Sequence, residues 1–254
     1  MTETKIIVAG AAGRMGQAIL AAAREAGVTI AGGTERPGHS AIGSAYGGGV
    51  IADRVAPFAK GGGVLIDFTA PAATLAHARA WTASPMVIGT TGFSAGEEAE
   101  IVRLSKASPI VKSGNFSLGV NVLAALAKKA ASVLGPDYDI EIVEAHHRAK
   151  ADAPSGTALM LGQAAAEGRG VAFEGAMRLD REGVREKGVI GMAVIRGGGI
   201  VGDHDVMFAG ASELVRLSHR ALDRSLFARG AIAAARWVAD KPPGLYSMAD
   251  VLGL

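Results

Sequence analysis

The sequence predicts an α/β protein, with a Rossmann-like, doubly wound parallel sheet followed by a second α+β domain. Up to residue 117, short β-branched runs alternate with helical patterns, which implies right-handed βαβ crossovers. The apolar runs contain few polar residues, as strands covered on both faces require. After residue 117, helices give way to strand-like runs separated by glycines, a pattern typical of an α+β arrangement.

The first half contains the elements of the doubly wound sheet. Strands are expected at Lys5–Ala9, Val28–Gly32, Val64–Phe68, Met86–Gly89 and Pro109–Lys112. Helices are expected at Met15–Ala26, Pro71–Thr82 and Ala95–Ala107, where apolar residues recur at helical spacing. The carboxyl ends of the strands then share one edge of the sheet, where open α/β sheets bind ligands.

The second half begins with a long helix, which is expected at Leu118–Leu134. A strand at Asp139–Ala145, a polar segment at His146–Ser155 and a helix at Thr157–Glu167 follow. Further strands are expected at Val189–Arg196, Asp205–Ala209 and Leu214–His219, and a last helix at Ser225–Ala239. This last helix can pack on either domain, and the clustered strands suggest a mostly antiparallel or mixed sheet.

Composition excludes several classes of protein. The formal charge of +2 is too small to imply a nucleic-acid partner, and no Lys/Arg cluster is interleaved with aromatic residues. We expect no membrane span, because the most apolar stretch, Leu118–Leu134, is interrupted by Asn121, Lys128 and Lys129. The absence of cysteine excludes disulfides and fits a reducing compartment. With no signal peptide before Lys5, we expect a cytoplasmic location.

A glycine-rich turn, Gly10-Ala11-Ala12-Gly13-Arg14-Met15-Gly16, joins the first strand to the first helix. Glycines let the backbone approach a pyrophosphate, and the helix start offers free N–H groups. The spacing G-x-x-G-x-x-G matches the usual G-x-G-x-x-G only loosely, and such turns also occur without a ligand. The position between strand and helix favours a dinucleotide site.

Glu35-Arg36 follows the second strand, about 20 residues after the turn, where an acidic residue binds the adenine ribose hydroxyls of a dinucleotide. Arg36 can pair with a 2′-phosphate, so NADH and NADPH are both candidate cofactors. The alternative is an ordinary solvated Glu-Arg pair in a loop. Two further loops, Gly89–Gly92 and Gly114–Phe116, follow later strands, but such loops are also common as plain turns.

The most informative stretch runs from Glu144 to Ala158 and reads E-A-H-H-R-A-K-A-D-A-P-S-G-T-A. Ser155 can cap a helix, and the N–H groups of Gly156 and Thr157 would then face a carboxylate. Histidine and lysine nearby supply positive charge and transferable protons. This combination suits a small anionic substrate that gains a proton.

Other interpretations of this stretch stay open. His146 and His147 could bind a metal with Asp203-His204-Asp205, but adjacent residues on a strand point to opposite faces, so we expect no metal site. The segment could also be a solvated loop or a regulatory anion pocket without chemistry. His39, His77 and His219 are scattered along the sequence, and we interpret them as structural.

The stretch resembles the signature of the dihydrodipicolinate reductases, also called 4-hydroxy-tetrahydrodipicolinate reductases, at every fixed position. The glycine turn has the form found in that family. Further matches are Asp67-Phe68-Thr69, Gly89-Thr90-Thr91-Gly92-Phe93, Asn115–Asn121, Arg196 and Ile200–His204. The resemblance covers nearly the whole chain.

The resemblance implies a dinucleotide-binding domain at residues 1–117, joined by residues 223–254, and a substrate-binding and oligomerisation domain at residues 118–222. It implies a homotetramer formed through the sheet of the second domain. The implied reaction is NAD(P)H-dependent reduction of 4-hydroxy-tetrahydrodipicolinate, a small dicarboxylate cyclic imine, to tetrahydrodipicolinate in lysine and diaminopimelate biosynthesis. A non-catalytic NAD(P)-binding sensor on the same fold is the alternative, and it would not need Lys150 or the two histidines.

The family correspondence also assigns roles to residues. His146 and Lys150 would be the acid/base groups, and His147, Ser155, Gly156 and Thr157 would bind the substrate carboxylates. The cofactor NADH or NADPH would contact Gly10, Ala11, Ala12, Gly13, Arg14, Met15, Glu35, Arg36, Gly89, Thr90, Thr91, Ser113, Gly114, Asn115 and Phe116.

Overall fold

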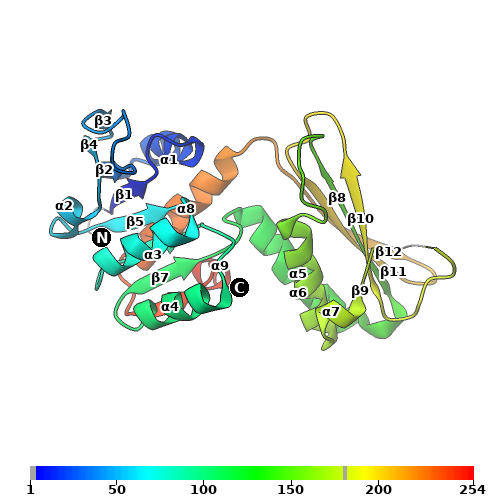
Figure 1. The fold of residues 1–254 in the computed structure, drawn as a ribbon. Helices are drawn as coiled ribbons and strands as arrows, with labels where there is room; N and C mark the ends of the chain where they lie inside the picture. Colours follow the sequence, from blue (N-terminus) through cyan, green and yellow to red (C-terminus); the bar gives the residue numbers. More distant parts are fainter. Residues whose placement is uncertain (1–3, 180–181) are drawn as a thin grey trace. The chain divides into compact units, whose positions relative to one another are not determined.

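A computed structural model describes residues 4–179 and 182–254. The chain forms two compact units (Figure 1). The first unit runs to Leu118 and also includes Ser225–Leu254, and the second is Gly119–Arg224. The last long helix, which could have packed on either part, therefore belongs to the first unit.

The first unit contains the predicted Rossmann-like sheet, with strand order β13-β7-β6-β5-β1-β2-β4-β3. The strand pairs are parallel, except for the antiparallel pair β3–β4. Its strands are β1 (Lys5–Ala9), β2 (Thr29–Thr34), β3 (Ala45–Tyr46), β4 (Gly49–Ala52), β5 (Val64–Asp67), β6 (Met86–Ile88), β7 (Pro109–Lys112) and β13 (Gly244–Tyr246). The order reverses between β1 and β5, and ligands bind at such switch points.

Helices cover both faces of this sheet, as the doubly wound fold requires. They are α1 (Arg14–Glu25), α2 (Ala56–Ala59), α3 (Pro71–Ala80), α4 (Ala95–Ser105), α8 (Ser225–Val238) and α9 (Met248–Leu252). α1 and α8 pack together against Ile6 and Val8, while α3 and α4 pack over Ile7 and Leu65 on the other face. α8 comes so close to the chain after β7 that a Cβ on Gly230 would lie 1.6 Å from the Phe116 carbonyl oxygen.

Several short elements of the first unit were not predicted from the sequence. These are β3, β4, α2, β13 and α9, none of which exceeds five residues. β2 begins at Thr29 and continues to Thr34, two residues beyond its predicted end. This extension carries the strand to the residue before Glu35, at the carboxyl edge of the sheet.

The second unit is α+β, as predicted, with a mixed sheet of order β12-β11-β8-β10-β9. Its strands are β8 (Asp139–His146), β9 (Met177–Arg178), β10 (Ile190–Arg196), β11 (Asp203–Ala209) and β12 (Leu214–Arg220). β8 is parallel to β10 and antiparallel to β11. The helices α5 (Leu118–Leu134), α6 (Gly156–Arg169) and α7 (Phe173–Ala176) lie on one face of the sheet (Figure 1).

By length and composition alone, the helical segment Leu118–Asp137 is long and apolar enough to cross a membrane. Within the second unit, however, Leu123 and Ala127 of α5 belong to the same buried cluster as Ile140 of β8 and Leu161 of α6. This packing accounts for the apolar side of the helix without a membrane.

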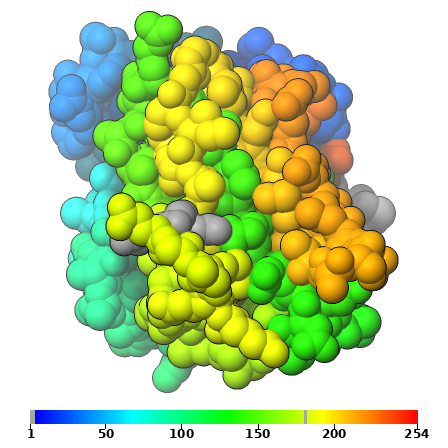
Figure 2. Space-filling model, turned by 90° about the vertical axis from the view of Figure 1, so that its right-hand side faces the viewer, coloured from blue at the N-terminus to red at the C-terminus, as the bar shows by residue number. Residues whose placement is uncertain are grey.

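The opposite face of the second sheet is not covered by any helix of the second unit, as far as the structure describes that unit. Figure 2 looks onto it, with β8 (green) between β10 (yellow) and β11–β12 (orange). Along β12, exposed residues alternate with half-buried ones. Ile195 and Leu214 leave half or more of their surface exposed, so this open face is partly apolar.

Candidate active site

The glycine turn has the backbone geometry that a dinucleotide site needs. Gly10 has a positive φ of 68°, and the N–H groups of Gly10 and Ala11 both donate to the Thr34 carbonyl. A Cβ on Gly16 would lie 2.4 Å from the carbonyl oxygens of Gly10 and Ala11, so only glycine lets α1 approach the turn. α1 begins at Arg14, and its N-cap, Gly13, has no side chain to satisfy the first-turn N–H groups.

Glu35 lies against this turn, as its position after β2 led us to expect. One carboxylate oxygen, Oε1, accepts a hydrogen bond from Ala12 N–H at 2.9 Å. The other, Oε2, accepts one from Arg36 N–H at 3.3 Å. The side chains of Arg14 and Arg36 are exposed. The glycine turn, the start of α1 and Glu35 therefore lie together within the first unit. This arrangement fits a dinucleotide.

The loop after β6 is tied into the interior of the first unit. The Thr90 hydroxyl lies 2.8 Å from the Thr74 hydroxyl and 3.4 Å from Asp67 Oδ1. Asp67 is fully buried, and its Oδ2 lies 2.7 Å from His77 Nδ1. The Thr90 hydroxyl is thus engaged inside the unit, whereas the neighbouring Thr91 is exposed. The sequence offered no sign of this Asp67–His77 pair.

The segment after β7 forms a tight polar turn. Ser113 Oγ donates to the Asn115 carbonyl at 2.8 Å, and the Asn115 side chain accepts from Ser117 N–H at 2.8 Å. Phe116 is buried and packs edge-on against Phe68, with ring centroids 5.3 Å apart. Gly114 is exposed at this edge of the sheet.

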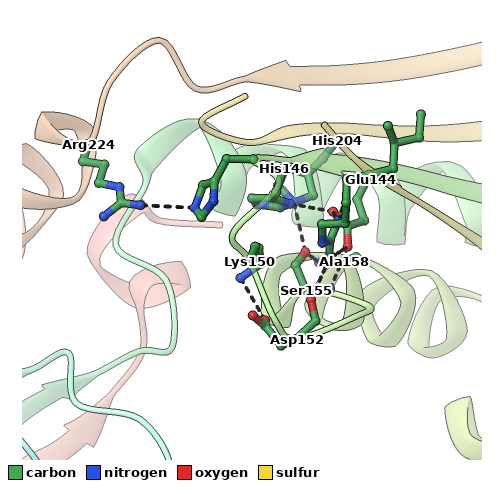
Figure 3. Close-up of polar contacts among 11 residues, drawn as sticks. Glu144, His146, Lys150, Asp152, Ser155, Ala158, His204 and Arg224 are labelled. Atoms are coloured by element: carbon green, nitrogen blue, oxygen red, sulfur yellow. Dashed lines mark hydrogen bonds and ion pairs between the residues drawn. The ribbon is translucent and has the colours of Figure 1, made fainter. Parts of the chain in front are cut away.

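In the second unit, His146 is held by a buried carboxylate (Figure 3). His146 and Glu144 lie two residues apart on β8 and so share a face of the sheet, and His146 Nδ1 is 2.5 Å from Glu144 Oε2. Arg196 on β10 donates to both Glu144 oxygens, at 2.8 and 2.7 Å. Burial raises the pKa of Glu144, but the hydrogen bonds from Arg196, His146 and Ser155 outweigh it and hold the pKa below its usual value.

The helix start predicted at Ser155 is confirmed. Ser155 is the N-cap of α6, and its Oγ accepts a hydrogen bond from Ala158 N–H at 3.2 Å. Ser155 N–H donates to Glu144 Oε1 at 2.9 Å, which fixes the helix start against β8. Gly156 and Thr157 form the first turn, where the helix dipole favours an anion.

Lys150 and His147 lie in the loop between β8 and α6. Lys150 N–H donates to the His147 carbonyl at 3.0 Å, which closes a turn. The Lys150 ammonium pairs with Asp152 at 2.8 Å, and this bond lowers the pKa of the Asp152 carboxyl. His147 Nε2 lies 3.5 Å from Arg224 Nη2. Sequence reasoning missed Arg224, which no local motif marks.

His204 lies beside His146, and His219 lies beside His204. His204 on β11 stands opposite Glu144 in the strand register, and its ring meets that of His146 edge-on at 5.2 Å. His204 Nε2 is 3.3 Å from Ser155 Oγ. The ring centroid of His219 is 6.5 Å from that of His204. Sequence reasoning treated His219 as structural and His204 as a possible metal ligand. Within residues 4–179 and 182–254, no group of three or more His, Asp or Glu side chains is arranged to hold a metal.

Because His204 is buried, we expect the stability of the folded chain to depend on pH. Burial and then the neighbouring His146 lower the pKa of His204 to about 4, against charges on Glu144 and Asp203 that raise it. In the unfolded chain, His204 takes up a proton near pH 6.5. Between about pH 6.5 and about pH 4 the unfolded chain therefore binds more protons than the folded chain, and the free energy of unfolding falls as the pH drops through this range. At about 1.4 kcal/mol per pH unit, this amounts to about 3 kcal/mol.

The expected result is a melting temperature that falls across this pH range more steeply in the parent than in His204→Gln. Burial also lowers the pKa of His219, so the informative quantity is the difference between the two proteins. Calorimetry in a series of buffers measures it. Equal slopes for the parent and the variant would contradict the assignment to His204.

Comparison with known proteins gives matches over both units. The family model for the N-terminus of dihydrodipicolinate reductase matches residues 4–116, and that for the C-terminus matches residues 119–252. The chain belongs to the dihydrodipicolinate reductase family. Its fold and its dinucleotide turn are therefore those of an NAD(P)H-dependent oxidoreductase.

Curated members of this family are similar to the chain over its whole length. The 4-hydroxy-tetrahydrodipicolinate reductase of Dinoroseobacter shibae is 51% identical over 264 residues, which cover 98% of both chains. That of Caulobacter vibrioides is 51% identical over 255 residues, with 98% and 97% covered. A solved dihydrodipicolinate reductase from a Paenisporosarcina species, with dipicolinate bound, has a TM-score of 0.80 and 21% identity, with 98% and 99% covered. The solved structure supports the fold.

Proposed function

We propose that the chain reduces 4-hydroxy-tetrahydrodipicolinate to tetrahydrodipicolinate with NADH or NADPH, in lysine and diaminopimelate biosynthesis. The observation that carries the proposal is the segment Glu144–Ala158. It places a histidine held by a carboxylate at the end of β8, and the helix that follows the next loop can receive an anion at its amino end. A protein that only sensed NAD(P) would need the glycine turn but not this segment.

The proposed substrate is a small cyclic imine with two carboxylates. The N–H groups at the start of α6, in Gly156 and Thr157, receive one carboxylate, and the cap residue Ser155 supports that turn. His147 supplies a further donor, with the guanidinium of Arg224 beside it. The Lys150 ammonium and the Arg224 guanidinium add positive charge that attracts the dianion.

His146 and Lys150 are the proposed acid/base groups. The hydroxyl group of the substrate leaves as water, and the cofactor, when bound, supplies a hydride to the ring carbon that carried it. Electron density then moves toward the ring nitrogen, and the resulting enamine-like species needs a proton. A positioned acid lowers the barrier of such a transfer, typically by a factor of about 100 to 10,000. Histidine and lysine are both residue types that exchange protons with a reacting group in this way.

The cofactor is proposed to bind the first unit. Gly10–Met15 would hold the pyrophosphate at the start of α1, and Glu35 and Arg36 would contact the adenine ribose. The loops at Gly89–Thr91 and Ser113–Phe116 follow β6 and β7 at the same edge of the sheet. Thr90 contributes by holding its loop in place, because its hydroxyl bonds to Thr74.

A coupled assay with freshly made substrate tests the proposal, and we expect turnover with NADH, NADPH or both. Pyridine-2,6-dicarboxylate should compete with the substrate, because it carries both carboxylates on a planar ring and cannot accept a hydride. Its affinity should fall as salt is added, since part of the attraction is between charges. Competition with NADH alone would place the anion pocket elsewhere. Cofactor binding without any turnover would favour the sensor.

We also propose a cytoplasmic homotetramer. The open, partly apolar face of the second sheet supports assembly, since a sheet face that no helix covers can pack against another copy. The family resemblance suggests four copies. Light scattering of the purified protein measures the number of subunits.

A further inference from the structure

Glu144 is a buried carboxylate that the proposed reaction does not use as an acid or a base. Its residue is only 1% exposed, which is unusual for a charged side chain unless it is paired. We propose that Glu144, held by Arg196, is the positioning residue that fixes the tautomer and the orientation of His146. The catalytic consequence of this inference rests on the function proposed above.

The Glu144 carboxylate makes four contacts, and the three from Arg196 and Ser155 come from N–H donors. Oε2 lies 2.5 Å from His146 Nδ1 and 2.8 Å from Arg196 Nη1. Oε1 accepts from Arg196 Nη2 at 2.7 Å and from Ser155 N–H at 2.9 Å. Because its pKa is lowered, Glu144 is ionised at neutral pH and can only accept hydrogen bonds. His146 Nδ1 must therefore carry a proton.

This hydrogen bond decides what the other ring nitrogen can do. With a proton on Nδ1, the neutral ring presents a lone pair at Nε2, and the protonated ring presents an N–H there. Exchange of the proton with a reacting group thus occurs at Nε2 alone. A neutral His146 with its proton on Nε2 would face the carboxylate with a lone pair, which is repulsive.

The surroundings of the ring hold it in this orientation. The His204 ring meets it edge-on at 5.2 Å. On the Nε2 side lies Gly202, where a Cβ would come within 3.1 Å of Nε2. Any larger residue at this position would press on the nitrogen that transfers the proton.

The Glu144 carboxylate also sets the distance between the proposed acid, His146, and the proposed carboxylate-binding turn at the start of α6. One oxygen contacts His146 and the other contacts Ser155, the cap of α6. Movement of Glu144 would therefore shift the proton donor and the proposed carboxylate-binding turn relative to each other. Arg196 balances the buried charge and limits the rotation of the carboxylate by its two-pronged contact.

The test compares Glu144→Gln with Glu141→Gln. Glu141 lies on the same strand, faces the other side of the sheet, and pairs with Arg185 at 3.0 Å, so it matches Glu144 in chemistry but not in place. Nitrogen NMR of the histidine rings reports which nitrogen carries the proton. It is recorded with NADH and pyridine-2,6-dicarboxylate added, and His146→Gln assigns the signal.

We expect the parent and Glu141→Gln to show His146 protonated on Nδ1, and Glu144→Gln to show a mixture of tautomers. Its kcat should fall about 10- to 100-fold, the loss typical of carboxylates that orient a metal-bound histidine, while the KM for the cofactor stays unchanged. Should Glu144→Gln not fold, Glu144→Gln/Arg196→Met removes both buried charges together and should give the same tautomer mixture and loss of kcat.

An unchanged tautomer in Glu144→Gln would overturn the inference. The same tautomer change in Glu141→Gln, or a tautomer change without loss of kcat, would overturn it as well. A parent protein without reductase activity would instead refute the proposed function, while the NMR comparison would still decide whether Glu144 orients His146.

Discussion

Replacing Lys150 with alanine should lower kcat by a factor of about 100 to 10,000, the range typical for the loss of a positioned proton donor. The substrate KM should rise much less, because proton donation stabilises the transition state more than the bound substrate. In the structure, Lys150 is fixed by a turn to His147 and by its pair with Asp152, so its ammonium is held rather than freely mobile.

A matched control is Lys128→Ala. Lys128 is an exposed lysine of α5 that pairs with Glu167 at 3.0 Å. The substitution therefore removes the same charge from the same unit. Lys128→Ala should turn over at the parent rate. Nicotinamide fluorescence should show unchanged cofactor binding in both variants.

His146→Gln should behave like Lys150→Ala, and the double variant should lose less than the two losses combined if both groups serve one proton transfer. Turnover of Lys150→Ala at the parent rate would mean that the acid is another group, and the role of Lys150 would be wrong.

Much of the fold could be predicted from the sequence because the signals are local. The buried parallel strands appear as apolar runs, and the amphipathic helices between them repeat every three to four residues. The start of α6 was found from Ser155, a residue type that caps helices. The short elements β3, β4 and β13 were missed because two to four residues are too few to show a period.

The candidate site was only partly predictable, since its surroundings come from strands far along the chain. Arg196 reaches Glu144 because β10 pairs with β8 in a register that sets it opposite His146. His204 lies opposite Glu144 through the register of β11. No local pattern fixes such registers. The sequence marked the residues of the β8–α6 loop but not the network around them.

The second large expected effect concerns the preference of the protein for NADPH or NADH. Arg36→Ala should weaken NADPH binding about 10- to 150-fold and leave NADH nearly unchanged. The reason is that one charge-assisted hydrogen bond to the 2′-phosphate contributes about 1.5–3 kcal/mol. The structure supports this choice: Arg36 is exposed and follows Glu35, whose carboxylate contacts the glycine turn at Ala12.

The measurement is a fluorescence titration of each protein with NADPH and with NADH. Arg54→Ala is the matched control, because Arg54 is another exposed arginine of the first unit that pairs only loosely with Asp53, at 3.7 Å. It should bind both cofactors like the parent. Raising the salt concentration should reduce the difference in NADPH affinity between the parent and Arg36→Ala, since screening weakens the guanidinium–phosphate attraction. Equal losses of NADH and NADPH in Arg36→Ala would show that Arg36 holds a part common to both cofactors, and the assignment to the 2′-phosphate would be wrong.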